Sequence, residues 1–294
     1  MNRALEVGRA NEPGGVKRPP FHFDYIEVND GTKNAHAFQY EDFSFIAVTL
    51  PLIELLWTLS EKLTASPLVL QLLQLSSREV RPDALRALLF QFQLSFLVSH
   101  EYTHDVHQHC ERDKSGMAGV WTEFVESEIA GGMESQAQEL DADGYAIFLA
   151  LAHYVRGAGR QSLLKQLGMQ DLTTYEGDEL LLMCFLLALM AFFCAIWPDD
   201  VKVDSIRQLR HPPAPVRIEY ARRVAKMWCT QYKSVPESWF SDERFQALFR
   251  AGLEAFGGAT RQSWDAQVMF LQSEEGTRYD QQLFDHFEVV RKSE

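Results

Sequence analysis

The stretch PDALRALLFQFQLSFLVSHEYTH, from Pro82 to His104, determines much of the fold and carries the first functional signal. A proline suits the first turn of a helix, because the N–H that it lacks has no helical partner there. Apolar residues then recur at helical spacing, at Leu85, Leu89, Phe92 and Phe96. The same face continues to His100 and His104. The stretch therefore predicts one long amphipathic helix that ends in a His-Glu-x-x-His sequence.

The His-Glu-x-x-His sequence has the spacing of a zinc-binding helix. A helix advances by about 100° per residue, so His100 and His104 lie one turn apart on the same face. Two imidazoles so placed can chelate one Zn²⁺ ion, which lowers the pKa of a bound water to about 7. Glu101 projects next to them and can accept the proton of that water. Two structural histidines at a helix end would also match the pattern, so the zinc hypothesis requires a third ligand.

The best candidate for the third ligand lies in Glu139-Leu140-Asp141-Ala142-Asp143, within a helix expected at about 134–155. Glu139 and Asp143 share one helical face. Glu139 can ligate zinc while Asp143 accepts a hydrogen bond from a ligand histidine and fixes its tautomer. Carboxylates on a helix more often form a solvated face. We favour the ligand because catalytic zinc normally has three protein ligands and one open position.

Other residues compete for the same role. His104, His107 and His109 are close enough in sequence to form a ligand set without Glu139. Such a set would leave the downstream acidic motif without a purpose, so we expect His107 and His109 to line the rim of the site or to bind metal adventitiously. Weaker reserve ligands are Glu123, Glu126, Glu128 and Glu134.

A third region of interest is the proline-rich segment His211-Pro212-Pro213-Ala214-Pro215. Three prolines in four positions cannot continue a helix, so an irregular turn is expected, followed by a helix at about 216–233. The rigid turn would hold His211 in a fixed direction, where it can stabilise a developing oxyanion. Arg217 can orient a carboxylate or the loop through its planar guanidinium. A structural turn with an incidental histidine is the simpler alternative.

The remaining chain predicts a mainly α protein of α+β class with a small β element. Residues 1–20 are expected to form a flexible arm, and residues 21–48 favour strands, with Asn29-Asp30-Gly31 as the turn of a hairpin. Helical spacing begins after Pro51, and a loop or short strand is expected near 120–125. We predict one metallopeptidase domain over 21–235 and a helical extension over 236–294 that packs on it.

The segment Leu180–Trp197 is an unbroken apolar run of 18 residues, at the lower limit for crossing a bilayer. Its flanks are Asp178-Glu179 and Asp199-Asp200, so neither end has the Lys or Arg typical of membrane anchors. A buried central helix explains an all-round apolar surface as well. We favour the core helix and keep membrane association through 180–197 as the alternative.

Overall charge and cysteine usage limit the class of protein. The net charge of −13 argues against general nucleic-acid binding, which needs clustered Lys and Arg, and weakly against docking on anionic membranes. Its 4 cysteines form no Cys-x-x-Cys pair, which is typical of reduced thiols. Residues 1–20 lack the apolar stretch of a signal peptide. We therefore predict a cytoplasmic protein.

Together the three motifs resemble those of the gluzincin zinc peptidases, which combine His-Glu-x-x-His with Glu-x-x-x-Asp on the next helix. The segment His211–Ile218, HPPAPVRI, is similar to the His-Pro-Pro-x-x-x-Arg-Ile of the HtpX and CAAX-prenyl-protease family. This resemblance implies a zincin-like helical core. It also implies roles for individual residues: zinc ligands His100, His104 and Glu139, general base Glu101, supporting residue Asp143, and a substrate-facing His211.

The resemblance covers about residues 85–220. Membrane members of that family have several spanning helices, whereas this chain offers one candidate, and neither the first 80 residues nor the last 60 share the likeness. Lit-like and ImmA-like peptidases are alternative relatives. The function expected is a zinc-dependent endopeptidase with a polypeptide substrate. The alternative is a non-catalytic, zinc-stabilised interaction protein.

Overall fold

The computed structural model describes residues 21–40, 43–76, 78, 80–107, 109, 120–122, 132–196, 203–233, 235–256 and 268–292. Its helices are α2 (Leu50–Ala65), α3 (Pro67–Leu72), α4 (Pro82–Val106), α6 (Gly132–Leu151), α7 (Gly159–Leu167), α8 (Thr174–Ile196), α9 (Ala214–Tyr232), α10 (Asp242–Phe256) and α12 (Glu274–Lys292). Short turns are π-helical at η1 (Ala152–Arg156) and 3₁₀-helical at η2 (Val203–Gln208) and η3 (Glu237–Phe240). The mainly α, α+β class is confirmed. The predicted arm, Cys110 and the reserve ligands Glu123, Glu126 and Glu128 lie outside the described residues.

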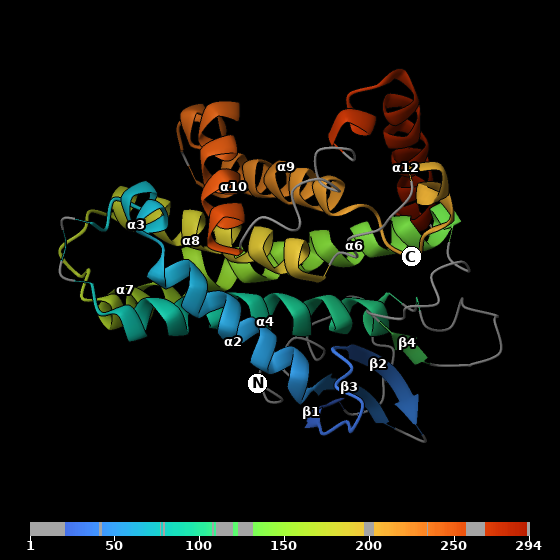
Figure 1. Cartoon of the computed structure of the whole chain (residues 1–294), viewed down its shortest axis with the longest axis horizontal. Helices are drawn as coiled ribbons and strands as arrows, with labels where there is room; N and C mark the ends of the chain where they lie inside the picture. Colours follow the sequence, from blue (N-terminus) through green and yellow to red (C-terminus); the bar gives the residue numbers. More distant parts are fainter. Residues whose placement is uncertain are drawn as a thin grey trace.

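Two helices at the centre of the molecule, α4 and α6, lie side by side and position the site (Figure 1). Helix α4 begins at Pro82, as predicted, and an aspartate in its first turn interacts favourably with the helix dipole. Helix α6 ends at Leu151 and continues as the π-helical turn η1 to Arg156, so the helix predicted at 134–155 is present with a changed last turn. Helix α9 begins at Ala214, so Pro215 lies in its first turn and the irregular turn ends at Pro213, earlier than predicted.

The strands form one sheet in the order β1-β3-β2-β4 beside the C-terminal half of α4 (Figure 1). Their bounds are Phe21–Ile26 for β1, Ala35–Tyr40 for β2, Phe43–Thr49 for β3 and Val120–Thr122 for β4. Strand β1 pairs parallel with β3, whereas β2 and β3 pair antiparallel. The predicted hairpin about Asn29-Asp30-Gly31 is therefore wrong. The largely buried β3 takes the central position and separates the two strands that this turn connects.

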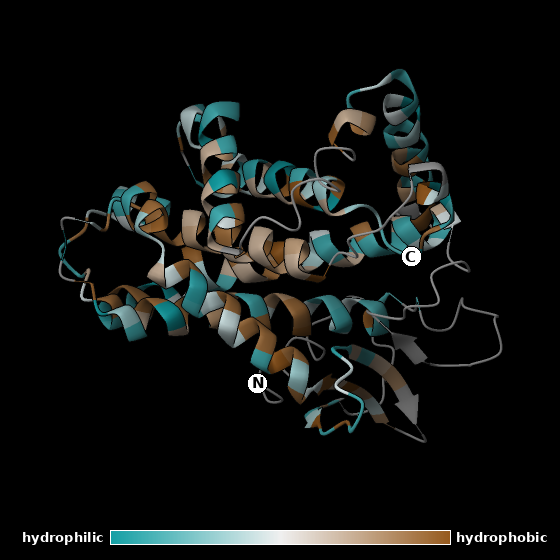
Figure 2. Cartoon of the chain, viewed as in Figure 1, coloured by the Kyte–Doolittle hydropathy of each residue, from teal (hydrophilic) through white to brown (hydrophobic). Residues whose placement is uncertain are grey.

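Helix α8 forms the centre of the hydrophobic core, and Figure 2 shows it as a mostly apolar helix. Phe92 on α4 meets Phe185 edge to face, with ring centroids 5.6 Å apart. Phe96 makes similar contacts with Phe192 and Phe193. Among the described residues, α8 is the one helix long and apolar enough to cross a membrane, and 83% of its apolar window is buried within the chain.

Acidic residues at the start of α8 pair with basic residues of three other helical regions. Asp178 accepts hydrogen bonds from Arg160 on α7 at 2.5 Å and from Lys233 after α9 at 2.7 Å. Glu179 lies 2.5 Å from Arg244 on α10. Asp178 and Glu179, the acidic residues that precede the apolar run, therefore connect α8 to other helical regions of the same chain.

The helices after residue 235 contact the central helices. The Tyr279 hydroxyl on α12 donates to the Gln136 side chain on α6 at 2.5 Å, and α10 packs on α8. Cys184, Cys194 and Cys229 are buried free thiols, and burial raises the pKa of each to about 12. These three thiols pack as apolar side chains in the hydrophobic core.

Candidate metal centre

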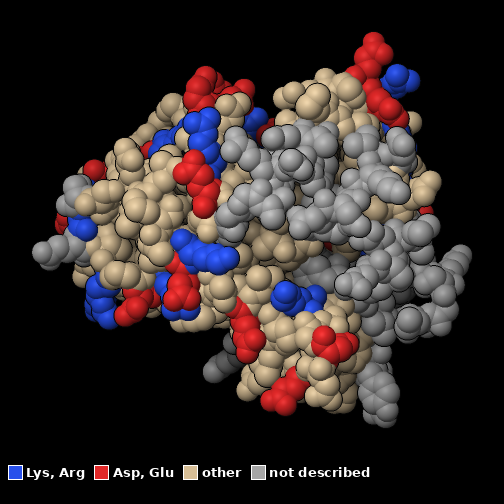
Figure 3. Space-filling view, in the orientation of Figure 1, with Lys and Arg blue, Asp and Glu red and all other residues tan. Residues whose placement is uncertain are grey.

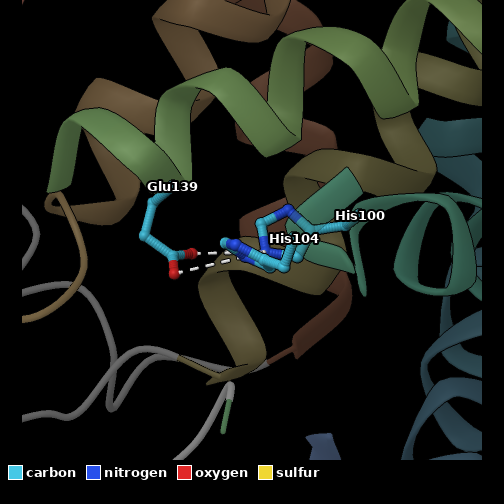
Figure 4. A group of neighbouring side chains, drawn as sticks. All are labelled: His100, His104 and Glu139. Atoms are coloured by element: carbon cyan, nitrogen blue, oxygen red, sulfur yellow. Dashed lines mark hydrogen bonds and ion pairs between the residues drawn. The ribbon is translucent and has the colours of Figure 1, made fainter. Parts of the chain in front are cut away.

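Three buried side chains from α4 and α6 meet in one cluster, which we call the first cluster: His100, His104 and Glu139 (Figure 4). The Nε2 atoms of the two histidines lie 3.0 Å apart. Glu139 approaches from the facing helix, with Oε2 3.3 Å from His100 Nε2 and Oε1 3.5 Å from His104 Nε2. Each side chain is at most 1% exposed. The structure thus brings together the three residues that the sequence selected as ligands.

The spacing of these atoms fits one zinc ion. Tetrahedral zinc with bonds of about 2.0–2.1 Å places neighbouring ligand atoms about 3.3–3.4 Å apart. The separations of 3.0, 3.3 and 3.5 Å bracket that value. Two imidazoles and one carboxylate are also the donor types of a catalytic zinc site with one open position. A small divalent transition metal therefore suits the cluster.

Protonation in the first cluster also suits a cation. Burial lowers the pKa of His104 well below its ordinary value, so this imidazole is neutral near pH 7. Burial raises the pKa of Glu139, but neighbouring His211 and the histidines of the cluster outweigh it and hold this pKa well below the ordinary value. A neutral imidazole and an ionised carboxylate are the forms in which these groups bind metal.

Asp143 and Arg217 hold His100 from behind. His100 Nδ1 lies 2.9 Å from Asp143 Oδ1, so the carboxylate lies against this nitrogen while Nε2 faces the cluster. Arg217 donates two hydrogen bonds to Asp143, at 2.8 Å from Nε and 2.7 Å from Nη2. The guanidinium also lies over the Phe193 ring, 4.5 Å from its centroid. Sequence reasoning placed Asp143 and Arg217 near the ligands, and they are found there.

His104 has a supporting residue that sequence reasoning missed. Its Nδ1 lies 2.9 Å from Nδ1 of His109, which is fully buried. With a metal on Nε2, His104 would carry its proton on Nδ1 and donate it to His109. The Nε2 atom of His109 then faces Asp141 Oδ2 at 3.6 Å. His109 was expected at the rim of the site, and its position just past the end of α4 follows no helical spacing that could have indicated this contact.

His211 lies on the solvent side of the first cluster. Its Nδ1 is 3.0 Å from Glu139 Oε2, and 20% of its side chain is exposed. Gln136, one turn before Glu139 on α6, donates to the carbonyls of Ile206 at 2.7 Å and Leu209 at 2.8 Å. This glutamine fixes the backbone that leads to His211. Sequence reasoning overlooked it, since a polar residue on a helix gives no sign of a distant backbone partner.

Two further residues predicted from the sequence, Glu101 and Glu134, differ in burial. Glu101 follows His100 on α4 and is fully buried. Glu134, a reserve ligand, is exposed in the first turn of α6 and does not join the first cluster. A hydrogen bond of 2.8 Å from Ser44 on β3 to Asp105 ties the sheet to the same end of α4.

No protein-family model, curated protein or solved structure matches the chain. The likeness to gluzincin peptidases stays a prediction that rests on the three sequence motifs. The chemistry of the site is accordingly argued from its residues.

Proposed function

We propose that the protein is a zinc-dependent endopeptidase of gluzincin type that hydrolyses a polypeptide substrate. The observation that carries the proposal is the donor geometry of His100, His104 and Glu139, with separations of 3.0, 3.3 and 3.5 Å. Support comes from Asp143, which orients His100 through a contact of 2.9 Å. A cluster oriented in this way matches a site built for a metal more closely than a chance meeting of polar side chains.

Zinc held by these residues would act as a Lewis acid and would lower the pKa of a coordinating water to about 7. Glu101 accepts the proton of the attacking water as its oxygen bonds to the scissile carbonyl carbon. Glu101 then gives that proton to the amide nitrogen, so the C–N bond breaks and the amine leaves neutral. Its burial supports this role, because exclusion of bulk water strengthens the interaction of the carboxylate with the attacking water.

His211 serves the same reaction from the solvent side. With Nδ1 directed at Glu139 Oε2 at 3.0 Å, its Nε2 is the atom left to face a substrate. When the ring is protonated, this atom donates a hydrogen bond to the carbonyl oxygen as negative charge develops there. The side chain is 20% exposed while its Nε2 atom is buried, so a polypeptide reaches this atom once the residues around it move.

The proposal is tested with the full chain loaded with zinc and a proteome-derived peptide library, with cleavage read by mass spectrometry. Glu101→Gln should keep its zinc and lose cleavage by about 10²–10⁴-fold, the usual contribution of a general base. Glu134→Gln, an exposed change on α6, is the matched control and should cleave at the wild-type rate. Wild-type rates from Glu101→Gln would exclude the mechanism.

A non-catalytic, zinc-stabilised interaction protein is the second candidate, and the position of His211 favours it. A fourth protein ligand closes a structural zinc site, and His211 Nδ1 already lies 3.0 Å from the Glu139 carboxylate. His211→Ala separates the two candidates. Zinc retained with cleavage lost supports the enzyme, whereas zinc lost together with stability supports the structural site.

We also propose that the protein is cytoplasmic, with α8 as a core helix. The contacts of Asp178 with Arg160 and Lys233 support this, because they tie the acidic end of α8 to other helices. Acidic and basic side chains are interspersed on the face in Figure 3, which supports the absence of a nucleic-acid partner. Recovery of the intact chain from a detergent-free soluble fraction is expected, and recovery in membranes alone would favour the membrane alternative.

A further inference from the structure

A second group of metal-binding side chains lies beside the first cluster, and we call it the second cluster: His107, His109 and Asp141. His107 caps the C-terminus of α4, and Asp141 lies on α6. One donor atom from each residue lies within 4.8 Å of the other two. Asp141 Oδ2 is the shared centre, hydrogen-bonded to His107 Nδ1 and 3.6 Å from His109 Nε2.

We propose that the second cluster is a separate site for a divalent transition metal ion, of weaker affinity than the first. Two imidazole nitrogens and a carboxylate oxygen form the same donor set that the first cluster offers. The separation of 3.6 Å between His109 and Asp141 is close to a tetrahedral edge of about 3.3–3.4 Å. The His107 side chain is 17% exposed, which gives an ion a route from solvent.

The weaker affinity of the second cluster follows from the position of its histidines relative to α4. His107 and His109 lie at and beyond the end of α4, so helix geometry does not hold their spacing as it holds that of His100 and His104. A hydrogen bond is lost on ion binding in both clusters, between His107 and Asp141 here and between His100 and His104 in the first cluster, so the difference lies in the helical restraint. Ion binding in the second cluster therefore has an ordering cost that the first cluster does not have.

The two clusters share one hydrogen bond, and this bond couples them. Zinc on Nε2 of His104 leaves the proton on Nδ1, which His109 Nδ1 accepts at 2.9 Å. A metal on Nε2 of His109 moves its proton to Nδ1, and two N–H groups then face each other. A buried donor without an acceptor is unfavourable. Each ion therefore weakens the binding of the other.

The site itself does not depend on the proposed function, and the coupling depends on zinc in the first cluster. The experiment is calorimetric titration of the chelator-stripped full chain with Zn²⁺ alone. Wild type should show a tight and a weaker binding event. His107→Ala and Asp141→Asn should each lose the weaker event, and His153→Ala, a change of an exposed histidine, should keep both. His107 is partly exposed, so its variant is the safer one for folding.

Glu139→Gln tests the coupling. Without zinc on His104, its ring can hold the proton on Nε2 and accept from His109, so the second site should bind zinc about 10-fold more tightly than in wild type. An unchanged or weaker affinity would exclude the coupling. A single event in wild type, or a weaker event that persists in His107→Ala and Asp141→Asn, would overturn the second site. Cleavage by Glu101→Gln would overturn the proposed function and leave this titration unchanged.

Discussion

The first and second clusters have the same kinds of donor, two histidines and a carboxylate from α6, yet their surroundings differ. In the first cluster the donor atoms are 3.0–3.5 Å apart. Its histidines sit within one turn of a continuous helix, and each has its second nitrogen held by a buried neighbour. In the second cluster, one histidine caps the helix and the other follows it.

We expect this difference to affect metal affinity, because the elements that carry the donors restrain them before an ion binds. A helix fixes the spacing of positions one turn apart before any ion binds, so little entropy is lost on binding. Residues at a helix end lack that restraint. The first cluster is therefore the candidate for tight, catalytic zinc. The variants below separate the two clusters, from the largest expected effect to the smallest.

Asp143→Ala should lower the free energy of unfolding by about 3–5 kcal/mol, because it leaves the buried guanidinium of Arg217 without its bidentate partner. Urea unfolding measures the loss. The matched control is Asp171→Ala, which breaks an exposed pair with Arg78 at 3.6 Å and should cost at most about 1 kcal/mol. Equal effects would show that the ion pair behind the first cluster is no more stabilising than a surface pair.

Glu139→Ala should weaken the tight zinc site by at least about 100-fold, because a lost ligand exceeds the usual effect of a lost supporting residue. Competition with a chromophoric chelator measures this affinity. Asp141→Ala, two positions away on the same helix, should leave the tight site within about 10-fold of wild type, since its described contacts are with His107 and His109. Reversed results would assign the tight site to the second cluster.

His109→Phe should weaken the tight site by about 10–100-fold, because the ring volume remains while the acceptor for His104 Nδ1 is lost. The same chelator competition applies, with circular dichroism as a check on folding. His153→Phe serves as the exposed control. A tight site of unchanged affinity would mean that His109 does not orient His104.

His107→Ala should change the affinity of the tight site by no more than about twofold, since its described contacts are with the second cluster and the Tyr145 ring. Metal content after dialysis gives the measurement. Loss of the tightly bound zinc from this variant, with retention in Glu139→Ala, would replace Glu139 by His107 in the ligand set.

Sequence patterns predicted those parts of the site whose spacing a helix enforces. His100 with His104, and Glu139 with Asp143, could be paired because positions four apart share a helical face. That α4 and α6 face each other followed from the need for a third ligand. The apolar run at 180–197 was expected as a core helix from its flanks, and most of its described part is buried.

What escaped prediction depends on how the backbone is routed between distant elements. The contact of His109 with His104 depends on the position of a residue beyond the end of α4, and no periodicity encodes it. Gln136 donates to the carbonyls of Ile206 in η2 and of Leu209 just after it, and such partners cannot be identified without the fold. The parallel pairing of β1 with β3 likewise overrode a local turn signal.

The pair between Asp143 and Arg217 joins positions 74 apart in the chain. A ribosome therefore releases both histidines and Glu139 well before it releases the guanidinium that neutralises Asp143. Until α9 is synthesised, the Asp143 carboxylate lacks its counter-charge. Its burial between α4 and α6 is then unfavourable, which disfavours packing of these two helices. Completion of the candidate metal centre thus waits for α9, and a chain interrupted before α9 carries the ligands without the ion pair that holds them together.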